Sequence, residues 1–230
     1  MSHPVPPLVP FRHGHSEWNL THRFTGWTDI ALTEVGIAEA EAAGRALARA
    51  GYGFDEVHGS VLQRCRQTAE ALLLAAMGTP NVPYHTGWRL NERHYGALQG
   101  LNKQEIFATW GEAASRRWWR GYVEAPPPLA SDDPRHPRFD PRYAALDPAD
   151  LPGSESLRDC QRRVLPYWHN VIVSRLRAGR RRNRTAPSAC RSAGTRTTTC
   201  SRRRRARGRR RAGTSSRRGA RRRPTPPAAS

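Results

Sequence analysis

The sequence predicts an α/β domain with a mostly parallel sheet, followed by an arginine-rich segment. Strand-like and helix-like stretches alternate over about the first eighty residues, which is typical of that class. All aromatic residues, including seven tryptophans, lie before residue 180. Residues 1–179 hold 20 basic and 19 acidic residues, whereas residues 180–230 hold 19 arginines and no acid. We therefore divide the chain into a domain at 1–179 and a tail at 180–230 that cannot bury a core.

The first expected elements are a strand and a helix. Residues 5–11 are apolar enough for a strand that leads into Arg12-His13-Gly14, although three prolines there remove ladder donors. Thr33 is placed to cap a helix that ends before Gly51. Ile37, Ala40 and Leu47 would share one face of this helix.

Further elements follow the same alternation. Residues 54–57 are expected to form a second strand, and Ser60 to cap a second helix that ends at Gly78. A last helix is predicted over residues 156–177, kinked or split by Pro166. Between these helices, residues 124–153 are rich in proline and aspartate, which indicates an ordered insertion long enough to form a lid.

Composition restricts the functional class. No stretch is long and apolar enough to cross a bilayer, and the N-terminus lacks the pattern of a secretory signal. The cysteines form no CxxC pair and indicate neither a disulfide framework nor a zinc site; they are Cys65, Cys160, Cys190 and Cys200. We expect a cytoplasmic protein with no membrane partner and no metal-ligand cluster.

The clearest chemical motif is RHGHSEWN at residues 12–19, directly after the first expected strand. Open α/β folds keep their sites at the carboxyl edge of the sheet, where such a turn lies. A neutral ring nitrogen of His13 can attack phosphorus, and the Arg12 fork matches phosphate oxygens. Ser16 and Asn19 follow at close spacing. Taken alone, RHG would also suit a histidine in a turn beside a surface arginine.

Several further segments carry a resemblance to a known family. They are RFTGWTDIALTEVG at 23–36, SVLQRCRQT at 60–68, WRLNERHYGALQGLNK at 88–103, the Pro/Asp insertion, SESLRDC at 154–160 and RVLPYW at 163–168. Together with RHGHSEWN they resemble the cofactor-dependent phosphoglycerate mutases of the histidine phosphatase superfamily. The resemblance covers nearly all of residues 8–179. It implies a three-layer α/β sandwich with a mostly parallel sheet.

The resemblance also implies roles for individual residues. His13 would accept the phosphoryl group, and Glu92 would exchange a proton with the substrate hydroxyl. Arg89 and Arg93 could keep Glu92 ionised, and burial could raise its pKa. The residues expected to bind substrate are Arg12, Ser16, Asn19, Thr25, Gly26, Arg64, Arg93, His94, Tyr95, Lys103 and Arg120.

The reaction that the resemblance implies is the interconversion of 2- and 3-phosphoglycerate, as in glycolysis and gluconeogenesis. A phosphohistidine would be the intermediate and 2,3-bisphosphoglycerate the primer, with no metal. The partners would be small phosphorylated three-carbon acids, and a homo-oligomer is compatible with the resemblance. Within the superfamily, a broad-specificity histidine phosphatase is the alternative, disfavoured by ERHYGALQGLNK.

The sequence departs from the family pattern at three points. His15 replaces an acidic or amide residue, and Trp119 replaces the first of two arginines. Beyond residue 179 the family continues with a strand ending in Ala-His-Gly-Asn, but here Pro187 stands at the aligned position and no histidine follows His169. Loss of that strand and of the second catalytic histidine predicts poor mutase activity and an exposed sheet edge.

The tail has two readings. It consists almost entirely of residues that a shifted frame of GC-rich DNA encodes, so our hypothesis is a frameshift near residue 180. If the tail is genuine, it is either a disordered, solvated basic extension or a segment whose arginine runs bind nucleic acid. Such binding would be non-specific, since the tail has no aromatic residue to stack on bases. The alternatives from other functional classes are an inactive remnant that acts only as a binding protein and an arginine-rich nucleic-acid binder.

Overall fold

The structure is a computed structural model, and it describes residues 8–178. The tail, with the frameshift hypothesis attached to it, lies outside the described residues. The helices and strands, in chain order, are α1 Glu17–Leu20, α2 Glu34–Arg49, β1 Val57–Gly59, α3 Gln63–Met77, β2 Tyr84–Thr86, η1 Trp88–Leu90, η2 Gly96–Leu98, α4 Lys103–Trp110, α5 Glu112–Arg120, η3 Pro137–Phe139, η4 Pro141–Tyr143, η5 Pro148–Asp150, α6 Leu157–Tyr167, η6 Trp168–Val173 and α7 Ser174–Arg177.

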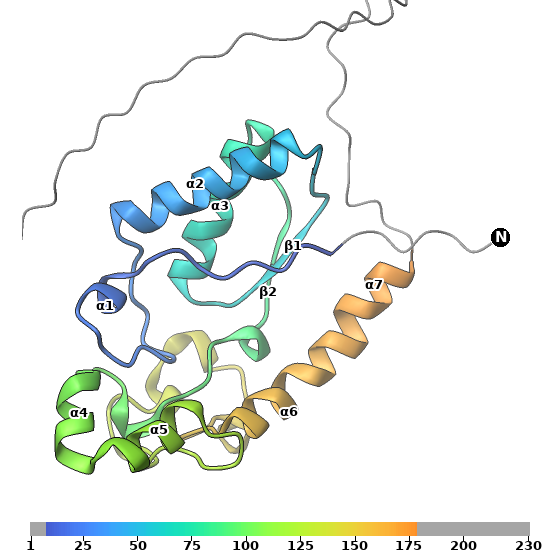
Figure 1. The fold of residues 1–230 in the computed structure, drawn as a ribbon. Helices are drawn as coiled ribbons and strands as arrows, with labels where there is room; N and C mark the ends of the chain where they lie inside the picture. The colour runs from blue at the N-terminus through green and yellow to red at the C-terminus, as the bar shows by residue number, and fades with distance from the viewer. Residues whose placement is uncertain (1–7, 179–230) are drawn as a thin grey trace, which may run out of the picture. The chain divides into compact units, whose positions relative to one another are not determined.

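The three expected layers are present. Figure 1 shows β1 and β2 between the α2–α3 pair and the long last helix of α6, η6 and α7. The two strands pair in parallel, with Val57, His58 and Gly59 opposite residues 84–86. The fold class is thus confirmed as α/β with a parallel sheet, although the sheet of residues 8–178 has only these two named strands.

The first strand prediction is wrong for the part that the structure describes. Residues 8–11 have no strand assignment, and residues 5–7 lie outside the described range. Pro10 has no N–H to donate to a ladder. In addition, an apolar cavity of about 360 Å³ lies between residues 8–11 and β1, lined by Phe11, Val57 and Ile172 among others. The sheet therefore does not extend from β1 to the segment before His13.

The two long central helices begin and end for local reasons. The Thr33 hydroxyl caps α2 by accepting from Gly36 N, as predicted. In the second of these helices, α3, Gly78 at the C-terminal end adopts φ +72° and terminates the helix, also as predicted. Ser60 is not the cap residue of α3, which begins after Leu62; its hydroxyl instead accepts from Leu62 N and donates to Asn91. The second strand is likewise shifted, from 54–57 to Val57–Gly59.

The Pro/Asp insertion is folded into the domain. It contains three short helical turns, η3 to η5, each with proline in its first turn and an aspartate or histidine cap. Tyr143 and Leu151 from this segment pack with Trp27 in a buried cluster. Asn91 donates to the Tyr143 hydroxyl at 2.8 Å. The insertion therefore supplies core to the region that follows β2.

The last helix is continuous but changes its winding. Ser156 and Asp159 form a capping box at the start of α6. Pro166 lies inside α6, and the π-helical segment η6 begins two residues later. A proline removes one helical donor, and a wider turn accommodates this without a break. None of the helices within residues 8–178 is both long and apolar enough to cross a membrane.

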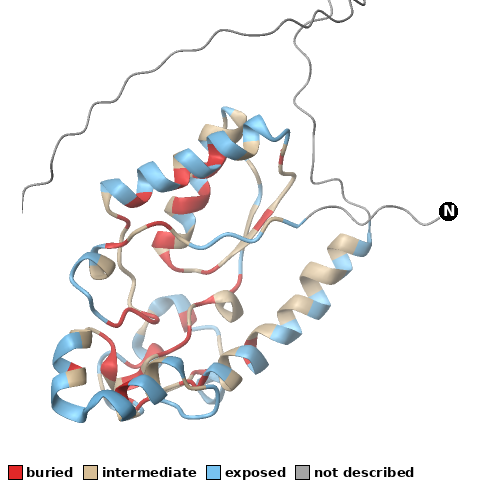
Figure 2. Ribbon diagram, in the orientation of Figure 1, coloured by how far each residue is buried: buried red, intermediate tan, exposed pale blue. Residues whose placement is uncertain are grey.

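Burial is uneven across the layers. In Figure 2 the facing sides of α2 and α3 carry buried residues, whereas η6 and α7 carry none. Leu72 and Leu73 of α3 pack with Val57 of β1. The opposite side of the sheet, toward η6 and α7, borders the cavity described above.

Candidate active site

The turn before α1 is held by close packing of backbone against backbone. A Cβ added to Gly14 would lie 2.3 Å from Gly36 O, and one added to Gly36 would lie 2.1 Å from His15 O. Gly14 N donates to the Thr68 hydroxyl of α3 at 3.1 Å. The glycine of the RHG motif is therefore required for the turn to lie directly against α2 and α3.

His13 is poised as a neutral imidazole. Its Nδ1 lies 2.7 Å from Gly14 O, which fixes Nδ1 as the protonated nitrogen and leaves the Nε2 lone pair for chemistry. Burial lowers the pKa of His13 to about 4; the bond to Gly14 opposes this shift, and Arg64 and Arg12 add to it. At neutral pH the ring is therefore uncharged, and Arg64 and Arg12 place positive charge near it.

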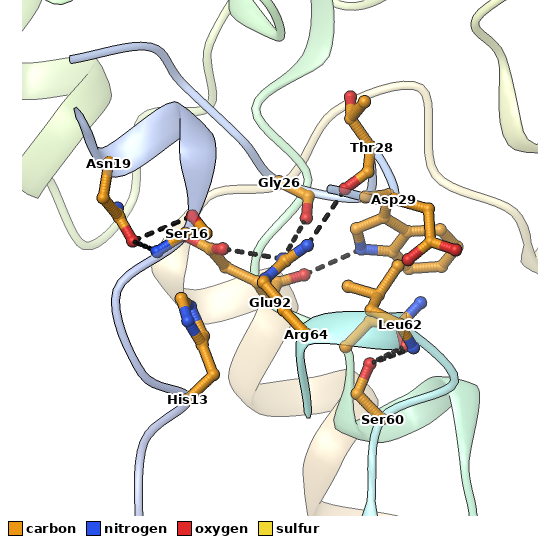
Figure 3. A network of polar contacts seen from close by, with 12 residues as sticks. His13, Ser16, Asn19, Gly26, Thr28, Asp29, Ser60, Leu62, Arg64 and Glu92 are labelled. Carbon is orange, nitrogen blue, oxygen red and sulfur yellow. Dashed lines mark hydrogen bonds and ion pairs between the residues drawn. The ribbon is translucent and has the colours of Figure 1, made fainter. Parts of the chain in front are cut away.

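Arg64 is fully buried in the first turn of α3, beside His13 in Figure 3. Its guanidinium donates to Gly26 O at 2.7 Å, to Thr28 O at 2.9 Å and to the Glu92 carboxylate at 3.0 Å. Its Nε is buried without a hydrogen-bond partner among residues 8–178. Such a donor suits an anionic ligand that is bound next to His13.

Glu92 is held at this site by its backbone and its side chain. The carbonyl of Glu92 accepts from Trp27 Nε1 at 2.7 Å and from Arg163 at 3.2 Å. The carboxylate is 32% exposed and pairs with Arg64. The expected partners Arg89 and Arg93 do not make this contact: Arg89 stacks on Trp88, and Arg93 donates to carbonyls of α5.

Two residues that the sequence interpretation missed position this loop. Arg163 of α6 forms a buried two-point ion pair with Glu155, at 2.6 and 2.8 Å. It also donates to the carbonyls of Trp88, Arg89, Asn91 and Glu92. Glu155 in turn accepts from His94 N at 2.8 Å. Both lie in segments used for the resemblance, but nothing in the sequence showed that they meet.

The residues after His13 are organised by hydrogen bonds. Ser16 is fully buried, and its N–H and hydroxyl both donate to Asn19 Oδ1. Figure 3 shows this pair on the side of His13 opposite Ser60. The contacts orient the Asn19 amide so that its nitrogen is the group able to donate to a ligand. Thr25 is buried, and Gly26, at φ +56°, contributes its carbonyl to Arg64.

Basic groups share one electrostatic environment around Glu92. Burial lowers the pKa of Lys103; the charge of Glu92 opposes the shift, whereas Arg12 and Arg120 reinforce it. Trp119, the substituted position, forms a platform: the Lys103 ammonium lies 5.4 Å and the Arg120 guanidinium 4.4 Å from its ring centre. The side chain that replaces an arginine thus orients two other cations.

The three residues after Glu92, which were expected to bind substrate, contact other groups of the protein. The Arg93 guanidinium stacks on Tyr95 at 4.8 Å and binds carbonyls of Trp118 and Trp119. His94 is fully buried, and its Nδ1 accepts from Gly96 N. Burial lowers the pKa of His94 to about 3 and raises the pKa of Tyr95. Through these contacts Arg93 and His94 stabilise the loop that carries Glu92.

Known proteins share long stretches of this sequence. A family model described as the histidine phosphatase superfamily (branch 1) matches residues 8–136. The chain is 52% identical over 174 residues to a 2,3-bisphosphoglycerate-dependent phosphoglycerate mutase of Nitratidesulfovibrio vulgaris (strain DSM 19637 / Miyazaki F), covering 76% of this chain and 70% of that protein.

Solved structures show a related fold. A mycobacterial glucosyl-3-phosphoglycerate phosphatase is 25% identical and matches with a TM-score of 0.52 in its complex with VO3 and 0.51 in its native form. Each match covers 70% of this chain, and 65% and 61% of the solved chains, respectively. This chain thus spans just under two thirds of the length of those structures.

Proposed function

Since the chain belongs to the histidine phosphatase superfamily, we propose that its site carries out phosphoryl transfer between 2- and 3-phosphoglycerate through a phosphohistidine at His13. The observation that carries the proposal is the neutral His13 ring beside the buried Arg64 guanidinium. The mutase named in the comparisons supports this choice of substrate. The free thiols Cys65 and Cys160 are consistent with a cytoplasmic enzyme.

In the proposed step, His13 Nε2 forms a bond to phosphorus while the bond from phosphorus to the substrate oxygen breaks. Arg64 Nε and the Arg12 fork would stabilise the equatorial oxygens. Glu92, in its protonated form, would give a proton to the departing oxygen and take it back in the reverse transfer. Lys103 and Arg120 would bind the substrate's remaining anionic groups.

The proposed primer is 2,3-bisphosphoglycerate, which supplies the first phosphoryl group when bound. A polyanion suits the site because the Lys103 ammonium and the Arg120 guanidinium both lie over the Trp119 ring, at 5.4 and 4.4 Å from its centre. Arg64 adds a buried N–H donor without a partner among residues 8–178. The proposed transfer uses no metal ion.

We further propose that turnover of this chain is impaired. The resemblance places a second histidine where Pro187 stands, and that role has no replacement after His169. Loss of one positioned proton-transfer or charge-stabilising group costs roughly 10²- to 10⁴-fold in rate. His13 also lines the cavity beside β1. Water can approach the phosphohistidine from there, which favours hydrolysis, and hence phosphatase activity, as the second candidate function.

The test is labelling with 2,3-bisphosphoglycerate that carries radioactive phosphate. We expect acid-labile label on the unmodified chain, none on His13→Asn, and full label on the control His22→Asn, which alters an exposed histidine. A His13→Asn chain that still carries the label would refute the assignment. A coupled mutase assay and phosphate release measured on the same samples separate the two activities, and near-normal mutase turnover would contradict the impairment.

A further inference from the structure

A second cluster of ionisable side chains lies on the sheet, apart from the residues placed around His13. It consists of Glu56, His58 and His85. His58 and His85 are opposite each other in the parallel register of β1 and β2, so their side chains share a face. Glu56 lies two residues before His58 and returns to the same face. The cluster depends on strand pairing, which is why the sequence alone does not reveal it.

The spacing of the three ligand atoms fits a tetrahedral metal ion. Glu56 Oε1 lies 3.4 Å from His58 Nε2, and Glu56 Oε2 lies 3.5 Å from His85 Nε2. One ligand atom from each residue lies within 4.8 Å of the others. A tetrahedral zinc ion with ligand bonds of about 2.0–2.2 Å separates neighbouring ligands by about 3.3–3.6 Å. Two of the separations lie in that range, one from each Glu56 oxygen, so a rotation of the carboxylate would bring one oxygen toward both rings.

The surroundings orient His58 as a ligand. Its Nδ1 lies 2.9 Å from the Tyr167 hydroxyl, and its ring stacks on His85 with centres 4.9 Å apart. A hydrogen bond at one ring nitrogen fixes the other for metal binding. The Nε2 of His58 is buried and forms no well-aligned hydrogen bond among residues 8–178; it faces Glu56 Oε1 at 3.4 Å. A metal ion between these two atoms would bind to both.

A cavity and the basic side chain of Arg175 both adjoin the cluster. Glu56 and His58 line the cavity of about 360 Å³, which can supply water to a fourth coordination position. Arg175 lines the same cavity and lies 2.6 Å from Glu56 Oε2. The positive charge of Arg175 therefore competes with a metal ion for the Glu56 carboxylate.

We propose that Glu56, His58 and His85 form a binding site for a zinc-class divalent cation, with water from the cavity as the fourth ligand. Two imidazoles and a carboxylate with an open position are a ligand set that zinc accepts. The ion would join β1 to β2 on the face toward the last helix. The site shares this cavity with His13 but uses none of the residues proposed for phosphoryl transfer.

The test uses the full chain after treatment with a chelator. Titration with Co²⁺ should produce the visible absorption bands of a four-coordinate ion, and Zn²⁺ should displace it. His85→Gln should weaken binding roughly tenfold or more. This ligand is chosen because its side chain is 37% exposed, so its loss leaves folding intact. The control His22→Asn removes an exposed histidine at φ +54°, a conformation that asparagine tolerates, and should bind like the unmodified chain.

A second variant is expected to strengthen metal binding instead of weakening it. Arg175→Gln removes the competing cation and should tighten Co²⁺ binding. Zn²⁺ should also raise the urea midpoint of the unmodified chain but not that of His85→Gln, a readout that does not depend on activity. Absence of the Co²⁺ bands, equal affinity in His85→Gln and the unmodified chain, or weaker binding in Arg175→Gln would each overturn the proposal.

Discussion

The two sides of the short sheet differ in how completely they are packed. On one side, α2 and α3 bury Leu72 and Leu73 against β1, and the backbone of Gly14 lies directly on α2. On the other side, η6 and α7 bury no residue and border a cavity. His13 belongs to both regions. Within residues 8–178, the RHG turn is held from the helical side, by Thr68 and Gly36.

The largest expected effect comes from breaking the packed side at Arg64. Arg64→Gln would leave the carbonyls of Gly26 and Thr28 without their donors and Glu92 without its partner, costing about 3–5 kcal/mol of unfolding free energy. Arg45→Gln, which removes an exposed pair with Glu41, should cost less than about 0.5 kcal/mol. Urea unfolding measures both. Similar losses in the two variants would contradict the packing argument.

A matched pair of leucines tests the difference directly. Leu72→Ala, on the packed side, creates a new cavity and should cost about 2–5 kcal/mol. Leu176→Ala removes a half-buried side chain that already lines a cavity, so its cost should stay below about 1 kcal/mol. The difference in urea midpoint between the two variants sharpens the comparison. Equal destabilisation would mean that the side of η6 and α7 is as tightly packed as the side of α3.

An effect that is smaller per pH unit should come from the buried histidines. The folded state holds the pKa of His94 near 3 and that of His13 near 4, whereas the unfolded value is 6.5. Between these limits the unfolded chain binds more protons, so stability falls as the pH drops below 6.5. Each histidine contributes at most about 1.4 kcal/mol per pH unit. Urea midpoints from pH 7 to pH 4 should therefore change less steeply in His94→Gln, and parallel curves would refute this.

Local sequence patterns predicted the helices better than the strands. Thr33 and Gly78 act as predicted because caps depend on residues that are adjacent in the chain. The strand expected at 54–57 lies instead at Val57–Gly59, because pairing with β2 sets its register. The strand expected before His13 fails in residues 8–11, where no ladder partner from the described chain reaches it.

In the candidate site, too, the sequence indicated individual residues but not the contacts between distant segments. The resemblance identified His13, Arg64 and Glu92, and the structure brings them together. It did not identify Arg163 and Glu155, whose ion pair holds the carbonyls of the Glu92 loop. The sequence interpretation paired Glu92 with Arg89 and Arg93, whereas in the structure Glu92 pairs with Arg64. Arg89 and Arg93 turn instead toward Trp88 and α5.

The sequence by itself determined that a near-neutral stretch at 1–179 is followed by an arginine-rich stretch at 180–230, because apolar content and charge are properties of composition. It also indicated His13 as the candidate nucleophile and predicted several helix ends, since short motifs and caps act over a few residues. Tertiary structure alone decided that Trp119 serves as a platform for Lys103 and Arg120. It also decided that Glu56, His58 and His85 meet. Such contacts depend on register and packing between distant segments, and no local pattern encodes them.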